Sequence, residues 1–223
     1  MDSIQKKKLL DKVASEIAAS KGGPLKDTGI NPVPGEGNPD ADLMFIGEAP
    51  GFNENEQKRP FVGQAGKLLR KTLVLNGWKE DEVYITNIVK FRPPENRDPT
   101  PAEIEYFKPY LDKQIEIIDP KIIVTLGRYS MYKFLGEGAS ISRIHGRVRS
   151  ITWQGRKILI FPMFHPAAAL RTGAILEEFE EDFKKLRELT DDGISTDSLQ
   201  ISTNSDRDSG DKRKEEIKQL QLI

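Results

Sequence analysis

Four short apolar runs, each followed at once by a polar or a glycine- and proline-rich loop, constrain the fold of this chain more than any other feature. The runs span residues 43–46, 83–89, 122–126 and 158–161. Segments with a helical period precede, separate and follow them, at residues 2–20, 66–75, 102–118, 130–135 and 176–189. Strands that alternate with helices favour a mostly parallel sheet that is covered on both faces. We therefore expect an α/β fold with a central, mostly parallel four-stranded sheet.

The loops that follow these runs predict where a ligand binds. In a parallel α/β sheet, ligands bind beyond the carboxyl ends of the strands. The loops here read GEAPG, NIVKFRPPENR, LGRYS and FHPAAALR. Several of them should therefore meet at one edge of the sheet.

Three of these loops carry side chains that suit binding or catalysis. Gly47 permits the backbone to approach a ligand closely, and Glu48 and Glu54 add carboxylates after it. Asn87 presents a donor and an acceptor side by side, and His165 follows the last run. Each residue alone also fits an ordinary structural role, as a solvated carboxylate, a backbone partner or a structural histidine. The first loop matches neither the P-loop nor the dinucleotide-binding pattern, which argues against a nucleotide cofactor.

The composition indicates one globular domain with a polar tail. With 223 residues, the chain is long enough for one full-sized domain, which we place at residues 1–189. Residues 190–223 are rich in Asp, Ser, Thr, Lys and Glu and contain no aromatic residue. Such a composition predicts a disordered charged tail. Its apolar end, IKQLQLI, leaves a short docking peptide for a partner as the alternative.

Several classes of protein are disfavoured by composition. No apolar run approaches the roughly 20 residues of a membrane helix, and the N-terminus lacks the pattern of a secretory signal, so we expect an intracellular, cytoplasmic protein. The net charge of −1 permits DNA binding without requiring it. The chain has no cysteine and two histidines, which removes disulfides, thiolate metal ligands and a cysteine nucleophile.

The motifs taken together resemble one known family. The segments GEAPG and PFVGQAG, then TNIVKFRPPENRDP, then HPAAALR occur in the order and spacing of the family 4 uracil-DNA glycosylases of thermophilic bacteria and archaea. The resemblance runs from about residue 9 to residue 189 and includes VPGEG at 33–37 and PKIIVTLG at 120–127. It implies the three-layer α/β/α sandwich of the uracil-DNA glycosylase superfamily. It also implies a monofunctional repair enzyme, without a lyase step, that hydrolyses the N-glycosidic bond of uracil and leaves an abasic site.

The resemblance assigns roles to the residues of the first, second and last motifs. The catalytic positions are Glu48, Glu54 and His165. The positions that bind uracil are Gly47, Ala49, Phe61 and Asn87, with Phe61 stacked on the base and Asn87 on its N3–H and O4 edge. In the best-known glycosylases of the superfamily an Asp that positions water stands where this chain has Ala49. Water activation is then expected from Glu48, Glu54 or backbone carbonyls.

The substrate implied by the resemblance is uracil-containing DNA, double- or single-stranded. Base flipping requires a wedge that fills the gap left in the duplex, and residues 167–171, after His165, are the natural candidate. The candidate DNA contacts are Lys67, Arg92, Arg97, Arg143, Arg147, Ala168, Leu170 and Arg171. A sliding clamp or another repair protein is a candidate partner for the tail, and no membrane partner is expected.

The main departure from the family concerns its iron–sulfur cluster, which is typically held by four cysteines. The matching positions here hold Ser20, Gly23, Phe91 and Phe107. We therefore expect no such cluster, no metal and no other cofactor. We also expect Phe91 and Phe107 to fill the space by apolar packing; the alternative is that this region is merely looser and its rings are half exposed.

Three other interpretations remain open. A related glycosylase could prefer another deaminated base, hypoxanthine or xanthine, although Asn87 suits uracil. A catalytically inactive DNA-binding relative is the second, against which the retained pocket residues argue. The third is a covalent route through His145 in SRIHGR, as in relatives with a histidine on an arginine-rich loop. Their loop has a different sequence and follows the asparagine motif directly, where this chain has RPPENRDP.

Overall fold

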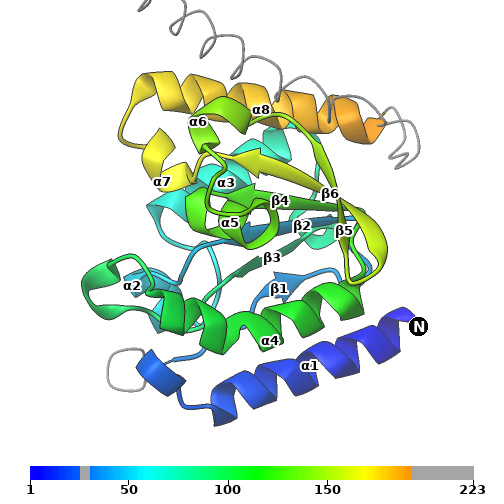
Figure 1. Ribbon diagram of the computed structural model, residues 1–223, viewed down its shortest axis with the longest axis vertical. Coiled ribbons are helices and arrows are strands. Elements are labelled where there is room, and N and C mark those ends of the chain that lie inside the picture. Colours follow the sequence, from blue (N-terminus) through cyan, green and yellow to red (C-terminus); the bar gives the residue numbers. More distant parts are fainter. Residues whose placement is uncertain (26–30, 192–223) are drawn as a thin grey trace, which may run out of the picture.

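A computed structural model describes residues 1–25 and 31–191 of the chain. These residues form a mixed sheet in the order β1-β3-β2-β4-β6-β5 (Figure 1). The strands are β1 (Glu36–Gly37), β2 (Leu43–Gly47), β3 (Tyr84–Asn87), β4 (Ile122–Leu126), β5 (Arg149–Trp153) and β6 (Arg156–Met163). Strands β3, β2, β4 and β6 are parallel to one another, whereas β1 and β5 pair antiparallel at the two edges. The prediction of an α/β fold with a mostly parallel sheet is confirmed.

The predicted count of four strands is wrong, because the sheet in the described residues has six. The four parallel strands are the four apolar runs, and the two additional strands are at the edges. An edge strand is half solvated, so it need not be an apolar run. β1 is only the dipeptide Glu-Gly, and β5 alternates between exposed and partly exposed residues. Neither could be recognised by apolar content.

The helices cover the sheet in two layers, which confirms the three-layer sandwich (Figure 1). Alternate residues of β2 point to opposite faces, so Met44 and Ile46 join one core and Leu43 and Phe45 the other. α1 and α4 cover the first face, and α3 and α8 the second. The α-helices are α1 (Ser3–Ala19), α2 (Phe52–Gln57), α3 (Gln64–Leu75), α4 (Pro101–Ile118), α5 (Arg128–Leu135), α6 (Ile141–Ile144), α7 (Pro166–Ala169) and α8 (Gly173–Asp191).

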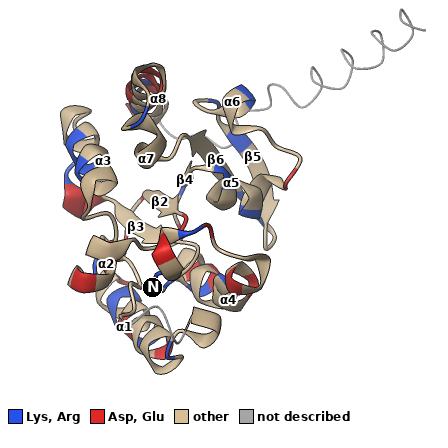
Figure 2. Ribbon diagram, turned by 90° about the vertical axis from the view of Figure 1, so that its left-hand side faces the viewer, with Lys and Arg blue, Asp and Glu red and all other residues tan. Residues whose placement is uncertain are grey.

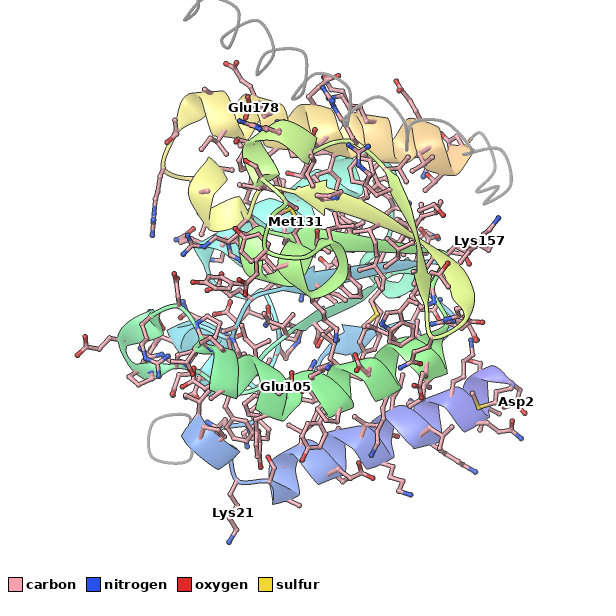
Figure 3. All side chains as sticks on the ribbon, viewed as in Figure 1. Asp2, Lys21, Glu105, Met131, Lys157 and Glu178 are labelled. Carbon is pink, nitrogen blue, oxygen red and sulfur yellow. The ribbon has the colours of Figure 1, made fainter. Side chains whose placement is uncertain are left out.

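Side chains fill both spaces between the sheet and the helices. Met131 of α5 lies inside the molecule and is fully buried, whereas Lys21, Lys157 and Glu178 lie at its periphery (Figure 3). The short helices α2, α6 and α7 were not expected from the sequence, because one turn or little more is too short for a period to show. Within the described residues no helix combines the length and the apolar character needed to cross a bilayer.

The last described helix, α8, continues through Asp191, two residues beyond the expected domain boundary. The expected disordered tail otherwise falls outside the described residues.

Candidate active site

A cavity of about 570 Å³ lies at the edge where the parallel strands end. Figure 2 views the molecule from this side, with basic residues on α3, α5 and α6 around the edge. The loops after β2, β3, β4 and β6 all contribute to the cavity, as the sequence predicted. The lining includes Glu48, Ala49, Gly51, Glu54, Phe61, Asn87, Asn96, Asp98, Arg128, His165, Ala168 and Arg171. The structure thus brings together every predicted catalytic residue and, apart from Gly47, every predicted uracil-binding residue in the lining of one cavity.

Gly47 lies against the side chains of Phe61 and Asn87, both of which line the cavity. It pairs in register with Asn87 across β2 and β3. A Cβ atom at Gly47 would overlap both the ring of Phe61 and the Oδ1 atom of Asn87. Gly47 therefore belongs to the site although it does not line the cavity, since its missing side chain leaves room for the other two.

Phe61 is held in an uncommon backbone conformation, with φ of 53°. Its carbonyl accepts a hydrogen bond from Arg70 Nε at 2.9 Å, and Gly66 lets α3 approach the Phe61 backbone. The centre of its ring is 5.8 Å from the centre of the His165 ring. The ring is 5% exposed and lines the cavity, so it offers a flat apolar face to a planar ligand.

Asn87 has an unpaired acceptor. The side chain is buried, and its Oδ1 atom has no hydrogen-bond partner among the described residues. A buried polar atom without a partner is costly to the folded state and therefore points to a ligand that supplies the missing donor. The Asn87 side chain is thus available to a ligand in the cavity.

The backbone of Asn87 is held from behind by Lys90, a residue that the sequence analysis did not select. The Lys90 ammonium is fully buried and donates to Asn87 O at 2.7 Å, Thr86 Oγ1 at 2.7 Å and Gln114 Oε1 at 2.6 Å. Pro34 O is a fourth and longer acceptor, at 3.4 Å. Burial lowers the pKa of Lys90 well below its ordinary value. A lysine next to an apolar strand resembles a surface residue in sequence, so only the structure reveals this role.

Glu54 organises the loops around the cavity. Its Oε1 atom accepts from the backbone N–H groups of Val62 at 2.8 Å and Gly63 at 2.7 Å, and its Oε2 atom accepts from Gly51 at 3.1 Å. Both carboxylate oxygens are therefore bonded to backbone groups that flank Phe61 and begin α2. This geometry favours a positioning role for Glu54 over activation of water.

Glu48 differs from Glu54 in its surroundings. Burial, followed by the neighbouring Asp98, raises the pKa of Glu48 to about 7, and Arg128 partly opposes this rise. A carboxyl group that titrates near neutral pH suits general acid–base chemistry. Glu48 is therefore the candidate for general acid–base chemistry at this site.

His165 is neutral at physiological pH and presents a defined donor. Burial lowers its pKa to about 4; Glu54 opposes the shift and Arg171 adds to it. The Nδ1 atom accepts a hydrogen bond from Ala167 N at 3.1 Å, as the N-cap of α7. A neutral ring whose Nδ1 accepts must carry its proton on Nε2. Nε2–H is then free to donate to a ligand.

The predicted DNA contacts fall into two groups. Ala168, Arg97 and Arg171 line the cavity, and Leu170 is 51% exposed at the C-cap of α7. The Arg97 guanidinium donates to both carboxylate oxygens of Glu103, from Nη1 to Oε2 at 2.9 Å and from Nη2 to Oε1 at 2.6 Å. The remaining candidates do not line the cavity: Lys67 on α3, Arg143 on α6, Arg92 and Arg147.

An exposed aromatic side chain at α2 was missed by the sequence analysis. Phe52 is 56% exposed beside the cavity-lining Gly51, and the Arg92 guanidinium lies 5.2 Å from the centre of its ring. Arg92 Nε donates to Asn96 Oδ1 at 2.7 Å. Exposed aromatic rings flanked by arginine are typical of surfaces that stack nucleobases.

His145 is separate from this site. Its Nδ1 atom lies 2.8 Å from Asp182 Oδ2, and its ring packs on Phe164. It does not line the cavity that holds Asn87 and His165. Its contacts give no support to a covalent route.

The positions that match the cluster ligands of the family hold no cysteine in this chain. Phe91 and Phe107 are 2% and 0% exposed, and their rings stack with centres 5.9 Å apart. The Tyr106 ring meets Phe107 edge-on and occupies the space that a side chain at Gly23 would need. Ser20 donates its hydroxyl to Ile17 O at 2.6 Å. Aromatic rings thus pack together at two of these positions, and among the described residues no group of three or more His, Asp and Glu is arranged to bind a metal ion.

The fold and the site define an α/β protein with a cavity at the carboxyl ends of its parallel strands, lined by an aromatic ring, a carboxamide and a histidine. Residues 34–187 match the sequence profile of the family described as Uracil DNA glycosylase superfamily. A type-4 uracil-DNA glycosylase of Sulfurisphaera tokodaii is 49% identical over 185 residues, which are 81% of this chain and 84% of the relative. The chain therefore belongs to the type-4 uracil-DNA glycosylase family, as its motifs predicted.

Other relatives match over a similar share of the chain. The type-4 uracil-DNA glycosylase of Archaeoglobus fulgidus is 44% identical over 184 residues, covering 81% of this chain and 92% of the relative. That of Thermotoga maritima is 40% identical over 183 residues, covering 79% and 94%.

Proposed function

We propose that this protein is a uracil-DNA glycosylase of DNA repair, which flips uracil out of DNA and hydrolyses its N-glycosidic bond. The observation that carries the proposal is the unpaired Oδ1 atom of Asn87, buried in a cavity beside an apolar ring and a neutral histidine donor. The names of the relatives support the same activity.

Recognition of the base follows from Phe61 and Asn87. The Phe61 ring stacks on the flat face of uracil. Asn87 Oδ1 accepts from uracil N3–H, and its amide N–H donates to O4. Cytosine has an amine at C4 and no proton on N3, so both hydrogen bonds would be lost. A site built around such a pair rejects the wrong base because its buried polar groups are then left unpaired.

His165 stabilises the leaving group. As the bond between N1 and C1′ breaks, its electron pair passes to the base and negative charge spreads onto O2. A neutral His165 that donates Nε2–H to O2 acts like an oxyanion hole, which is worth about 3–4 kcal/mol elsewhere. Neutrality suits this role, because the ring donates a hydrogen bond and keeps its proton.

Glu48 acts on the sugar side. Loss of the base leaves a positively charged, oxocarbenium-like sugar, which a nearby carboxylate stabilises. The same carboxylate accepts a proton from water as the oxygen attacks C1′. Glu54 keeps its backbone bonds throughout and holds the loop that carries Phe61.

The cavity can reach uracil only after the base leaves the helix. Leu170 and Arg171 are the proposed wedge, with Lys67, Arg92, Arg143 and Arg147 as phosphate contacts. Because Arg97 is paired with Glu103, we assign it a role in the loop structure.

We further propose that the enzyme works without the iron–sulfur cluster of its family and that residues 1–189 are the catalytic domain. The absence of cysteine from the sequence and the packing of Phe91 on Phe107 support the first of these. The cluster-free proposal predicts purified protein without iron, and stoichiometric iron would overturn it. A DNA substrate also places the enzyme inside the cell.

A strand-cleavage assay tests the activity. Oligonucleotides with U:G, U:A, single-stranded U or hypoxanthine are incubated with the protein and treated with alkali, which cuts abasic sites. We expect cleavage of all uracil substrates. Cleavage of hypoxanthine without uracil would indicate another deaminated base, and no cleavage with retained DNA binding would indicate an inactive relative.

A further inference from the structure

A carboxylate that no motif singled out lines the same cavity as Glu48. Asp98 and Arg128 both line the cavity with Glu48, although they come from the loop before α4 and from the start of α5. Arg128 Nη2 donates to Asp98 Oδ2 at 2.6 Å, and the Tyr129 hydroxyl donates to the same oxygen at 2.9 Å. Asp98 is thus fixed by two donors on one oxygen, which leaves its other oxygen for Glu48.

The loop that carries Asp98 has a strained backbone conformation. Glu95 and Asn96 both adopt left-handed backbone angles, with φ of 53° and 55°. The paired Arg97 and Glu103 fasten the loop to the first turn of α4. Such strain persists only where surrounding contacts maintain it, and here it places Asp98 at the cavity.

We propose that Asp98, fixed by Arg128 and Tyr129, is a positioning residue that sets the protonation state of Glu48 during base release. The proposal rests on the function proposed above. As water attacks, its oxygen bonds to C1′ and its proton passes to Glu48, while the electron pair of the N1–C1′ bond leaves with uracil. The new Glu48 carboxylic acid donates a hydrogen bond to Asp98. Asp98 has a 57% exposed side chain, so the proton then leaves to solvent through it.

Electrostatics agree with this arrangement. A second carboxylate favours the protonated form of Glu48, and a nearby guanidinium favours the ionised form. The pKa of Glu48, raised to about 7 by burial and then by Asp98 and partly lowered by Arg128, reflects both neighbours. The other charged or titratable side chains of the cavity are Glu54, Arg97, His165 and Arg171. Glu54 and Arg97 are bonded elsewhere, and His165 is neutral.

The test compares Asp98→Asn with Arg128→Gln, which should move the titration of Glu48 in opposite directions. Single-turnover uracil release is measured from pH 5 to 9. In the wild type, the rate should fall on the acid side of the pH profile with a midpoint near pH 7. This midpoint should be lower in Asp98→Asn and higher in Arg128→Gln. For a shift of about one pH unit, the rate at pH 6 relative to its own plateau rises about fivefold in the first variant and falls about tenfold in the second. Arg128→Lys should return this midpoint toward its wild-type value.

The control is Asp42→Asn, whose carboxylate pairs with Lys121 and is 56% exposed, as Asp98 is 57% exposed in its pair with Arg128. Asp42→Asn should leave the midpoint of the pH profile unchanged. Titration of carbon-13-labelled glutamate carboxyls in the free protein measures the same shifts without substrate. Glu48 shifts of opposite sign support the proposal, and Glu48 shifts that are absent or of one sign overturn it. Failure of the wild type to cleave uracil would instead refute the proposed function, whatever Glu48 does.

Discussion

The Phe61 ring and the Asn87 side chain converge on the space above Gly47, where a Cβ atom would overlap both. Gly47 has an ordinary backbone conformation, without the positive φ that favours glycine. Glycine is therefore required at this position for space and not for flexibility. In the proposed function, stacking on the base and recognition of its edge would both depend on the absence of a side chain at Gly47.

Gly47→Ala should slow uracil release by about 100-fold or more, because displacing a positioning group by about 1 Å can cost that much. The fold should persist, since the added methyl group meets side chains of the cavity. Single-turnover rates and thermal melts measure the two effects. The control is Gly138→Ala, where a Cβ atom has no heavy atom within 4 Å. Equal rates in the two variants would contradict the geometry described here.

Asn87→Asp should abolish the discrimination between uracil and cytosine. An ionised aspartate offers two acceptors and no donor, so it loses the bond to uracil O4 and can accept from the amine of cytosine. We expect uracil release to fall by at least about 100-fold and the ratio of uracil to cytosine release to fall further. Rates on otherwise identical U- and C-containing strands test this. An unchanged ratio would show that Asn87 does not contact the base edge.

His165→Ala and His165→Asn should both slow base release by about 100- to 1,000-fold, since alanine has no donor and the shorter asparagine side chain does not reach the position of His165 Nε2. Asparagine can still cap α7, so that variant should keep more stability. The affinity for DNA should change little. A large loss of affinity with an unchanged rate of release would assign His165 to binding.

The protonation state of His165 can be measured directly. Because its folded-state pKa lies at about 4, below the ordinary value of 6.5, the ring should be neutral above pH 5 and protonate only as the pH falls further. Nitrogen-15 shifts should show the proton on Nε2. A ring that titrates above pH 6, or a proton on Nδ1, would conflict with a neutral donor.

The sequence predicts those parts of this site that follow from periodicity and motif. Buried strands are apolar on both faces, so the four parallel strands and the edge where their loops meet could be recognised. The motif residues Glu48, Phe61, Asn87 and His165 indeed lie together. The different surroundings of Glu48 and Glu54 could not be predicted, because they depend on loop contacts: backbone N–H groups bond to the Glu54 carboxylate, whereas Asp98 and Arg128 lie near Glu48.

Residues that act through long-range contacts were missed for the same reason. Lys90 reaches Gln114 on α4, and Asp98 reaches Arg128 on α5. Nothing in the local sequence distinguishes Lys90 from a surface lysine or Asp98 from a turn residue. Only the packing of separate elements gives these polar residues their partners.

Phe107→Ala should destabilise the protein by about 3–5 kcal/mol, as expected when a fully buried phenylalanine is truncated and leaves a cavity. Phe91→Ala should cost a similar amount, because its ring stacks on Phe107. The matched control is Phe52→Ala, since that ring is 56% exposed; its cost should be within about 0.5 kcal/mol. Denaturant unfolding measures all three. Small losses for Phe91 and Phe107 would mean that the region is loose and that something else replaces the family's cluster.

Leu170→Ala should impair uracil release from duplex DNA but not from single strands. Leu170 is 51% exposed beside the cavity-lining Ala168 and Arg171, and its side chain can fill the gap that a flipped base leaves in a duplex. A single strand has no such gap, so the same variant should release its uracil at the wild-type rate. We expect the duplex rate to fall about tenfold, which corresponds to a loss of about 1.4 kcal/mol. Leu75→Ala, at a leucine that is 71% exposed at the far end of α3, should change neither rate. Equal losses on duplex and single strands would place Leu170 in the base pocket, because only a wedge depends on the opposite strand.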